Sequence, residues 1–296
     1  MKKRTRRILF YFSVLMFVLV GWLVLLFALG YKYDFVQNKF FKTGSFEIKT
    51  NASAQVYIND ELAGSTSFLG DSYSKGRLLP RTYNIRVDSE GYQSWRKLIK
   101  IEAGFLSSFP KVVLMPQNFD EELVASSSLA NIINREFDKE HSLAIVGNRQ
   151  KTETINLKNG EKEILKQSPI PVTSVGPKIT TPNYIISPDE NKNLWFTDHE
   201  IWIKWIKDSR YQPYMLAGDE ELVTRFSQKI SDAQWYKDSE HLIVNAGGVL
   251  EFVEIDGRDG INIFDITTIS GPFYYDRDMD AIFKFEGNKL LRIDLK

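Results

Sequence analysis

The stretch YKDSEHLIVN at residues 236–245, followed by VLEFVEID at 249–256, is a polar turn followed by two short apolar strands. Three other stretches follow the same plan, namely FDKEHSLAIV (137–146), SPDENKNLWFT (187–197) and YDRDMDAIFKF (275–285). Their turns contain Asp138, Asp189, Asp238 and Asp278, at spacings of 51, 49 and 40 residues. Such a period is the length of a propeller blade of four strands, so we predict a repeat domain of about four blades over residues 117–296.

The turn Ser187-Pro188-Asp189 resembles that of TolB-like and WD-repeat propellers, where polar residues close the hairpin before an inner apolar strand. The pairs Asn159-Gly160, Asp256-Gly257 and Gly287-Asn288 are typical of the outer hairpins. Four units are fewer than most closed propellers use. Further blades could lie in the divergent stretch 165–185, the ring could be small, or the array could be open; a two-sheet sandwich is the structural alternative.

Residues 44–116 show a different pattern, in which apolar and polar residues alternate. Phe46 and Ile48 alternate with charged neighbours, and Tyr83, Ile85 and Val87 alternate with polar ones. A period of two with one polar face predicts half-buried antiparallel strands. We expect two further strands, around Leu98 to Ile101 and Lys111 to Met115, to complete a small β-sandwich.

This region resembles a PEGA domain in the order of its motifs. They are G-x-F-x-I from Gly44, A-x-V-Y-I-N-D from Ala54, L-P-x-x-Y-x-I-x-V from Leu79, E-G-Y from Glu90, and then Trp95 and Gly104. Two departures stand out, since Asn51-Ala52-Ser53-Ala54 replaces the signature tetrapeptide and Arg81 replaces the usual Gly after Leu-Pro. The resemblance implies a small β-sandwich on a bacterial surface protein, acting as an interaction or carbohydrate-contacting module without catalytic residues.

The N-terminal part predicts a membrane segment. The run ILFYFSVLMFVLVGWLVLLFAL, from Ile8 to Leu29, carries no charge and is long enough to cross a bilayer. We therefore predict a cytoplasmic tail at 1–7, a transmembrane helix at 8–30 and a stalk at 31–43. Five cations precede the run (Lys2, Lys3, Arg4, Arg6 and Arg7), which favours a cytoplasmic N-terminus and extracytoplasmic C-terminal domains. A cleaved signal peptide is the alternative, although the apolar run exceeds the usual signal length.

Composition excludes several classes of function. Lys plus Arg and Asp plus Glu are equal at 38 each, so the charge balance gives no indication of a nucleic-acid partner. The chain has no Cys, which excludes disulfides, a thiol nucleophile and Cys-ligated metals. No phosphate-binding, dinucleotide or hydrolase motif is present, so we expect no cofactor and no enzymatic activity.

Two aromatic groups are the candidate binding sites. The first is the sandwich edge around Tyr57, Tyr92 and Trp95, and the second is the tryptophan hairpin 195–205, with Trp202 and Trp205. Aromatic rings can stack on the apolar face of a sugar, but large aromatics more often fill cores. Because Trp202 and Trp205 are three residues apart on one strand, they are expected to point to opposite faces.

Two groups of potential metal ligands are weaker candidates. His141 and His241 match in register before their strands, whereas His199 does not, so the histidines give little support for a shared metal site. Asp276, Asp278 and Asp280 resemble the start of a calcium loop, but Ala281 and Gly287 stand where that loop needs Gly and Glu. We expect no metal at either place.

These observations predict a mainly β, single-pass protein of the cell membrane that binds a partner in the bacterial cell envelope. The partner would be an envelope glycan or a membrane or envelope protein, with the lipid bilayer contacted through residues 8–30. The alternative is an enzyme acting on envelope polysaccharide, with paired carboxylates on the propeller face.

Overall fold

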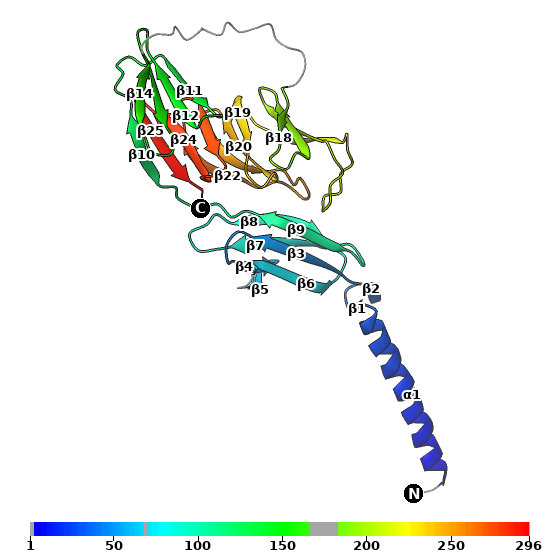
Figure 1. Cartoon of the computed structure of the whole chain (residues 1–296). Helices are drawn as coiled ribbons and strands as arrows, with labels where there is room; N and C mark the ends of the chain where they lie inside the picture. The colour runs from blue at the N-terminus through cyan, green and yellow to red at the C-terminus, as the bar shows by residue number, and fades with distance from the viewer. Residues whose placement is uncertain (1–2, 68–69, 166–182, 296) are drawn as a thin grey trace. The chain divides into compact units, whose positions relative to one another are not determined.

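The structure is a computed structural model that describes residues 3–67, 70–165 and 183–295 (Figure 1). The chain divides into two compact units. The first comprises Met1–Val87 and Arg96–Val112, and the second comprises Asp88–Trp95 and Val113–Lys296. The predicted class is confirmed, because the described residues form one N-terminal apolar helix followed by strands.

The helix α1 (Lys3–Ala28) has 26 residues and contains almost all of the uncharged run. Its mean hydropathy reaches 2.6, and none of its side chains is buried by the rest of the protein. At 1.5 Å per residue it is about 39 Å long, which exceeds the hydrocarbon thickness of a bilayer. By length and composition this helix could cross a membrane.

The segment predicted as a stalk forms a β-hairpin. Its strands β1 (Tyr31–Asp34) and β2 (Lys39–Lys42) pair antiparallel, with Tyr33 opposite Phe40. The amide and the hydroxyl of Thr43 both donate to the carbonyl of Gly30, at 2.8 and 2.7 Å. These bonds close the base of the hairpin directly after α1.

The rest of the first unit contains two sheets. Their strands are β3 (Gly44–Thr50), β4 (Gln55–Ile58), β5 (Glu61–Ser65), β6 (Ser72–Leu78), β7 (Thr82–Asp88), β8 (Trp95–Lys100) and β9 (Leu106–Val112). The sheet orders are β6-β3-β9 and β5-β4-β7-β8. The predicted alternation is observed, since every second residue of β3, β7 and β8 is buried. The ammonium of Lys97 lies 5.7 Å from the centre of the Phe109 ring, which joins β8 to β9 of the other sheet.

Gly44 is required where β3 begins. A Cβ at this position would lie 2.3 Å from the backbone oxygen of Glu102 and 2.7 Å from a methyl carbon of Ile101. The amide of the next residue, Ser45, donates to the carbonyl of Phe105 at 3.0 Å. The absence of a side chain therefore lets β3 approach the segment that connects β8 to β9.

The described residues of the second unit form four sheets of four strands. Their strands are β10 (Glu121–Ser126), β11 (Asn134–Asp138), β12 (Leu143–Gly147), β13 (Thr152–Asn156), β14 (Lys162–Leu165), β15 (Ile185–Ile186), β16 (Lys192–Phe196), β17 (Glu200–Trp205), β18 (Glu220–Arg225), β19 (Ile230–Trp235), β20 (His241–Ala246), β21 (Val249–Glu254), β22 (Ile263–Thr268), β23 (Phe273–Asp276), β24 (Ala281–Glu286) and β25 (Lys289–Asp294). Three sheets are meanders of consecutive strands, β11 to β14, β15 to β18, and β19 to β22. This is the propeller-like plan that the period predicts.

The fourth sheet joins the two ends of the repeat region, in the order β10-β25-β24-β23. The first strand, β10, pairs antiparallel with the last, β25, with Leu123 opposite Leu291. The earliest strand of the array thus completes the sheet formed by the latest ones. The stretch 165–185, where further blades could lie, falls largely outside the described residues.

Two hydrophobic clusters join neighbouring sheets. One lies between β15–β18 and β19–β22 and includes Ile203, Trp205 and Val244. The other lies between β11–β14 and the fourth sheet and includes Ile155 and Phe283. All six residues of β20 are buried, which explains its nearly continuous apolar sequence.

The Gly44→Ala substitution tests the close approach at β3. We expect it to lower the free energy of unfolding by about 1–3 kcal/mol, because the added methyl overlaps backbone that cannot easily shift. The control is Gly76→Ala in β6, where an added Cβ meets nothing within 4 Å. Denaturant unfolding of the full chain in detergent would measure both variants, and equal stabilities would contradict the packing described for Gly44.

Candidate functional site

The hairpin turn before β20 is organised by Asp238. Its Oδ1 accepts hydrogen bonds from the amides of Glu240 and His241 at 2.8 and 3.1 Å. Its Oδ2 lies 2.7 Å from Nδ1 of His241. One carboxylate therefore satisfies two backbone donors and fixes the orientation of the imidazole.

The turn before β12 repeats this bonding pattern. Asp138 accepts from the amides of Glu140 and His141 at 3.0 and 3.2 Å, and its Oδ2 lies 2.8 Å from Nδ1 of His141. The two histidines nevertheless differ in position. His241 is the first residue of β20 and is buried, whereas His141 precedes β12 and is exposed.

In the fourth sheet, the equivalent residue is Asp276 rather than Asp278, which corrects the assignment made from spacing. The Oδ1 of Asp276 accepts from the amides of Asp278 and Met279, both at 3.0 Å. Asp276 is buried at the end of β23, while Asp278 is exposed in the turn. The sequence spacing is ambiguous here because three aspartates alternate within five residues.

His241 is the most deeply buried titratable group of these turns. Its ring stacks on Phe252 with a centroid distance of 4.8 Å, and Glu254 is its partner on β21. Burial lowers the pKa of His241, but the charges of Asp238, Glu254 and Glu240 outweigh burial, so the net pKa is raised. A buried imidazole with three carboxylates near it is thus part of the core beside this turn.

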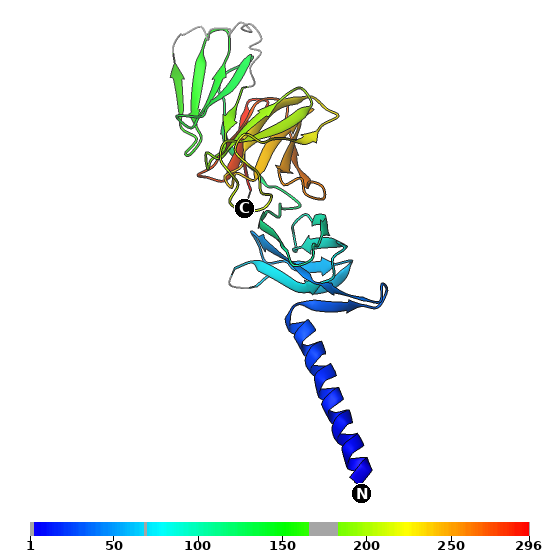
Figure 2. The ribbon, with the colours of Figure 1, turned by 90° about the vertical axis from the view of Figure 1, so that its right-hand side faces the viewer.

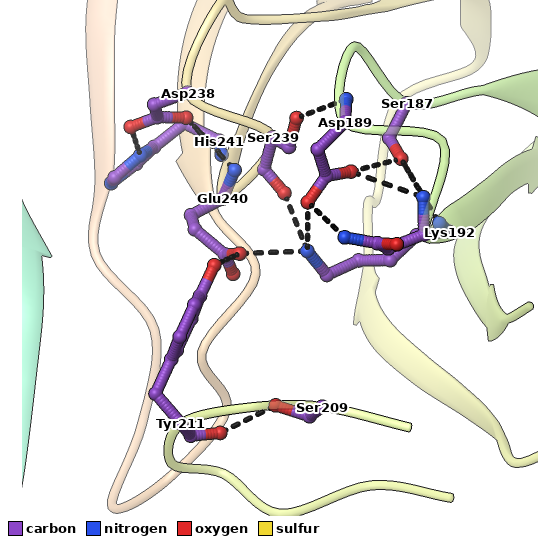
Figure 3. Close-up of polar contacts among 10 residues, drawn as sticks. Ser187, Asp189, Lys192, Ser209, Tyr211, Asp238, Ser239, Glu240 and His241 are labelled. Atoms are coloured by element: carbon purple, nitrogen blue, oxygen red, sulfur yellow. Dashed lines mark hydrogen bonds and ion pairs between the residues drawn. The ribbon is translucent and has the colours of Figure 1, made fainter. Parts of the chain in front are cut away.

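Figure 3 shows how the turns of two neighbouring sheets meet. The ammonium of Lys192 lies 2.7 Å from Oε1 of Glu240 and donates to the carbonyl of Ser239 at 3.0 Å. The hydroxyl of Tyr211 donates to the same Glu240 oxygen at 2.7 Å, and the amide of Asp189 donates to the Ser239 hydroxyl at 3.1 Å. Lys192 and Glu240 have only 7% and 14% of their side chains exposed, so the pair is held largely out of water.

A second bridge joins the turns of the next two sheets. The ammonium of Lys237 lies 2.7 Å from Oδ2 of Asp280, and the hydroxyl of Tyr275 donates to Oδ1 of Asp280 at 2.8 Å. Burial, and then the charge of Asp280, raise the pKa of the Tyr275 hydroxyl, so it stays protonated as a donor. In both bridges the charged groups are used to join sheets.

A cleft of about 590 Å³ lies at the end of β20 that is away from the His241 turn. It is lined by the turn between β20 and β21 and the loop between β22 and β23. Asp232 in this lining accepts from the Ala233 amide and from Nε2 of Gln234, both at 2.9 Å. Asn245 accepts from the Gly248 amide at 3.1 Å. These polar groups shape the cleft through bonds within the chain.

The tryptophan hairpin presents two of its rings on one face. Trp195 and Trp202 are opposite each other on β16 and β17, and their rings stack with a centroid distance of 5.3 Å and an interplanar angle of 6°. The Nε1 of Trp195 donates to Glu220 at 2.6 Å, and that of Trp202 donates to Glu200 at 3.0 Å. Both rings are partly exposed. Here they are called the tryptophan pair.

Trp205 lies on the opposite face of β17, as the three-residue spacing predicts. It is 5% exposed and belongs to the cluster between β15–β18 and β19–β22. The ring is therefore core, and only Trp202 of the two predicted residues is accessible to a ligand. The sequence indicated Trp195 only as part of the hairpin 195–205, because the pairing of its ring with that of Trp202 depends on the register of the hairpin.

The predicted sandwich-edge residues have separate environments. Tyr57 lies on β4, where the Arg86 guanidinium is 4.0 Å from its ring centre. Tyr92, in the second unit, forms an isolated bridge with Pro116. Trp95, the first residue of β8, belongs to the second unit and is 1% exposed. Its Nε1 donates to Glu254 at 3.4 Å. This burial assigns Trp95 to packing.

A pair of carboxylates lies on neighbouring strands of the second unit. Glu251 on β21 is the partner of Asp265 on β22. Burial, and then the charge of Asp265, raise the pKa of Glu251. Its Oε2 is buried and accepts no hydrogen bond from the described residues. No pattern in the sequence indicates this pair, because it depends on cross-strand register. Within the described ranges, no three His, Cys, Asp or Glu side chains form a group that could hold a metal.

No family model matches the chain, and no curated protein sequence matches it. The chain is similar to the solved structure of Hsv2 from Kluyveromyces lactis, with 9% identity, a TM-score of 0.25, and 70% of this chain and 64% of that chain covered. It is also similar to the β-propeller domain of Cps50 (Swd1) from Myceliophteria thermophila, with 10% identity, a TM-score of 0.29, and 74% of this chain and 64% of that chain covered.

The extracellular domain of a hybrid two component system from B. thetaiotaomicron gives 12% identity, a TM-score of 0.29, and coverage of 90% of this chain and 31% of that chain. The chain thus spans less than two thirds of the length of each of these structures.

The raised pKa of His241 predicts a pH-dependent stability. In the unfolded chain the pKa of this histidine is about 6.5. The stabilisation of the folded state by protonated His241 is therefore complete below that pH and is lost as pH rises through the higher folded pKa. We expect the free energy of unfolding to fall over this range in the parent chain and the His241→Gln variant to lack that fall. Denaturant unfolding at a series of pH values measures it.

The matched control is His141→Gln, which removes an exposed histidine that has the same contact with an aspartate. Solvent screens this pair, so most of the pH dependence should remain. If both variants retain the parent slope, His241 is not the group responsible.

Proposed function

We propose that the chain is a membrane-anchored binding protein of the bacterial cell envelope. In this proposal α1 is the anchor, residues 8–30 contact the bilayer, and both β units lie outside the cytoplasm. The wholly exposed apolar surface of α1 supports the anchor, because such a helix in water would expose more apolar area than soluble proteins normally do. The cations at its N-terminal end, which include Arg4, Arg6 and Arg7, support a cytoplasmic N-terminus.

The tryptophan pair is the observation that carries the binding role. Two flat, partly exposed indoles are held parallel by stacking and by hydrogen bonds to Glu220 and Glu200. Rings fixed in this way lose little conformational entropy when a ligand stacks on them. Glu200 also pairs through its Oε1 with Arg225 at 2.8 Å, whereas the second carboxylate oxygen of Glu220 can accept a hydrogen bond from a hydroxyl group. We infer that the preferred ligand is a glycan of the envelope, with an envelope protein as the other partner class.

The first unit fits this role as a second contacting module. The residues that resemble a PEGA domain, such as Phe46, Ile48 and Tyr83, form the buried faces of its strands. They therefore support a stable small β domain of that kind, and Tyr57 remains on its surface beside Arg86. The proposed role of this unit is to contact the envelope polymer or to space the second unit from the membrane.

The double variant Trp195→Ala, Trp202→Ala tests the binding proposal. The full chain in nanodiscs would be titrated with purified cell-wall polysaccharide and binding measured by co-sedimentation. We expect affinity at least about tenfold weaker in the variant, which corresponds to about 1.4 kcal/mol of lost stacking and burial.

The control is Tyr214→Ala, which removes an aromatic ring that is 73% exposed but outside the tryptophan pair. It should bind as the parent does. Saturable binding that is unchanged in the folded double variant would disprove the role of the tryptophan pair. No binding by the parent would favour the protein-partner class, to be identified by crosslinking in membranes.

A second candidate function is hydrolysis of envelope polysaccharide, and the Glu251 and Asp265 pair favours it. A carboxyl group with a raised pKa can act as a general acid, and a neighbouring carboxylate can act as base or nucleophile. Such an enzyme would lose activity as pH rises through the raised pKa of Glu251.

Release of reducing ends from purified cell-wall polysaccharide would test this candidate. We expect Glu251→Gln to abolish any release, because the amide cannot donate the proton that the leaving group needs. Glu286→Gln changes an exposed glutamate at the end of β24 and should have no effect. Equal activity of Glu251→Gln and the parent would rule out Glu251 as the acid.

A further inference from the structure

The hairpin of β1 and β2 exposes an apolar tip. Phe35 and Val36 are 83% and 85% exposed, and Phe40 is 44% exposed. Exposed apolar groups are common on proteins when they are scattered, but adjacent ones at the tip of an ordered hairpin usually mark a contact surface.

The tip is held in shape by its own contacts. The Oδ1 of Asp34 accepts from the amides of Val36 and Gln37, at 2.8 and 3.4 Å. The Tyr33 ring lies 5.0 Å from the rings of both Phe35 and Phe40, in edge-on geometry. The aromatic side chains therefore form one prearranged surface.

The exposed charges of the hairpin have a single sign. Lys32, Lys39 and Lys42 are exposed, whereas Asp34, the one acidic residue of the hairpin, is 8% exposed. Apolar and aromatic groups flanked by lysines suit a surface where hydrocarbon meets anionic headgroups. A protein partner would not require this combination.

The position of the hairpin indicates which surface it meets. It follows α1 after two residues and is fixed to the helix end by the bonds of Thr43 to Gly30. The Arg77 guanidinium from β6 lies 3.6 Å from the ring centre of Phe27, in the last turn of α1. Figure 2 shows that the hairpin turns aside from the helix axis. A hairpin in this place lies at the bilayer surface when α1 spans the bilayer.

We propose that the β1 and β2 hairpin is a membrane-interface element that inserts Phe35 and Val36 into the headgroup region of the bilayer. Lys32 and Lys39 contact anionic lipid headgroups beside it. The proposal rests on the anchoring role of α1 given above. It adds a second membrane contact, which restricts the tilt of the strands of the first unit about the C-terminal end of α1.

The test uses the full chain reconstituted into vesicles of phosphatidylcholine and phosphatidylglycerol. Because the chain has no Cys, the Val36→Cys substitution creates a single site for an environment-sensitive fluorophore. Quenching by lipids that carry a nitroxide near the headgroup reports its depth. Leu62→Cys, at a residue of β5 that is 60% exposed, is the solvent control, and Val18→Cys reports the middle of α1.

We expect quenching at Val36 to exceed that at Leu62 by at least about twofold, as for a residue at the acyl boundary. Charge reversal by Lys32→Glu and Lys39→Glu should lower the quenching at Val36 and leave that at Val18 unchanged. If the fluorophore at Val18 reports the bilayer interior while quenching at Val36 equals that at Leu62, the hairpin proposal fails and the anchor stands. If the fluorophore at Val18 is as exposed to water as the one at Leu62, the anchor fails and the hairpin proposal fails with it.

Discussion

The pairing of β10 with β25 is the constraint on which the second unit depends. Without β10, the last strand would be an edge whose backbone donors and acceptors lack a partner on one side. The closure extends to a neighbouring sheet, because the ammonium of Lys284 on β24 contacts both Glu121 on β10 and the Thr267 hydroxyl on β22. One strand from the start of the repeat region therefore stabilises two sheets near its end, and it brings together residues more than 160 positions apart.

Charged side chains also join neighbouring sheets of the second unit. Once the sheets are neighbours, their turns meet, and the pairs of Lys192 with Glu240 and Lys237 with Asp280 bridge them. Burying a charged group is costly unless it is hydrogen-bonded. Tyr211 donates to Glu240 of the first pair, and Tyr275 donates to Asp280, the buried member of the second. These polar groups are structural. The binding role that we propose therefore falls to the tryptophan pair, whose rings are partly exposed.

The sequence was sufficient to predict features that depend on local pattern and insufficient for those that depend on register. The period of the Asp-containing turns predicted the propeller-like sheets, and alternation predicted β3 and β7. Strands β5 and β6 escaped prediction because they are largely exposed and show no regular apolar alternation. The stacking of Trp195 on Trp202 and the closeness of Glu251 to Asp265 arise from cross-strand pairing. Asp276 could not be separated from Asp278 by spacing, since only the bonds to the turn amides distinguish them.

In our proposals, α1 anchors the chain, the hairpin after it meets the lipid surface, and the second unit presents a fixed pair of indoles to the envelope. All of this requires the β units to lie outside the cytoplasm. The most direct measurement is labelling of a Leu216→Cys variant in intact cells with a membrane-impermeant maleimide, since Leu216 is 65% exposed and the chain has no other thiol. The account predicts labelling before lysis. Labelling only after the inner membrane is opened would contradict it.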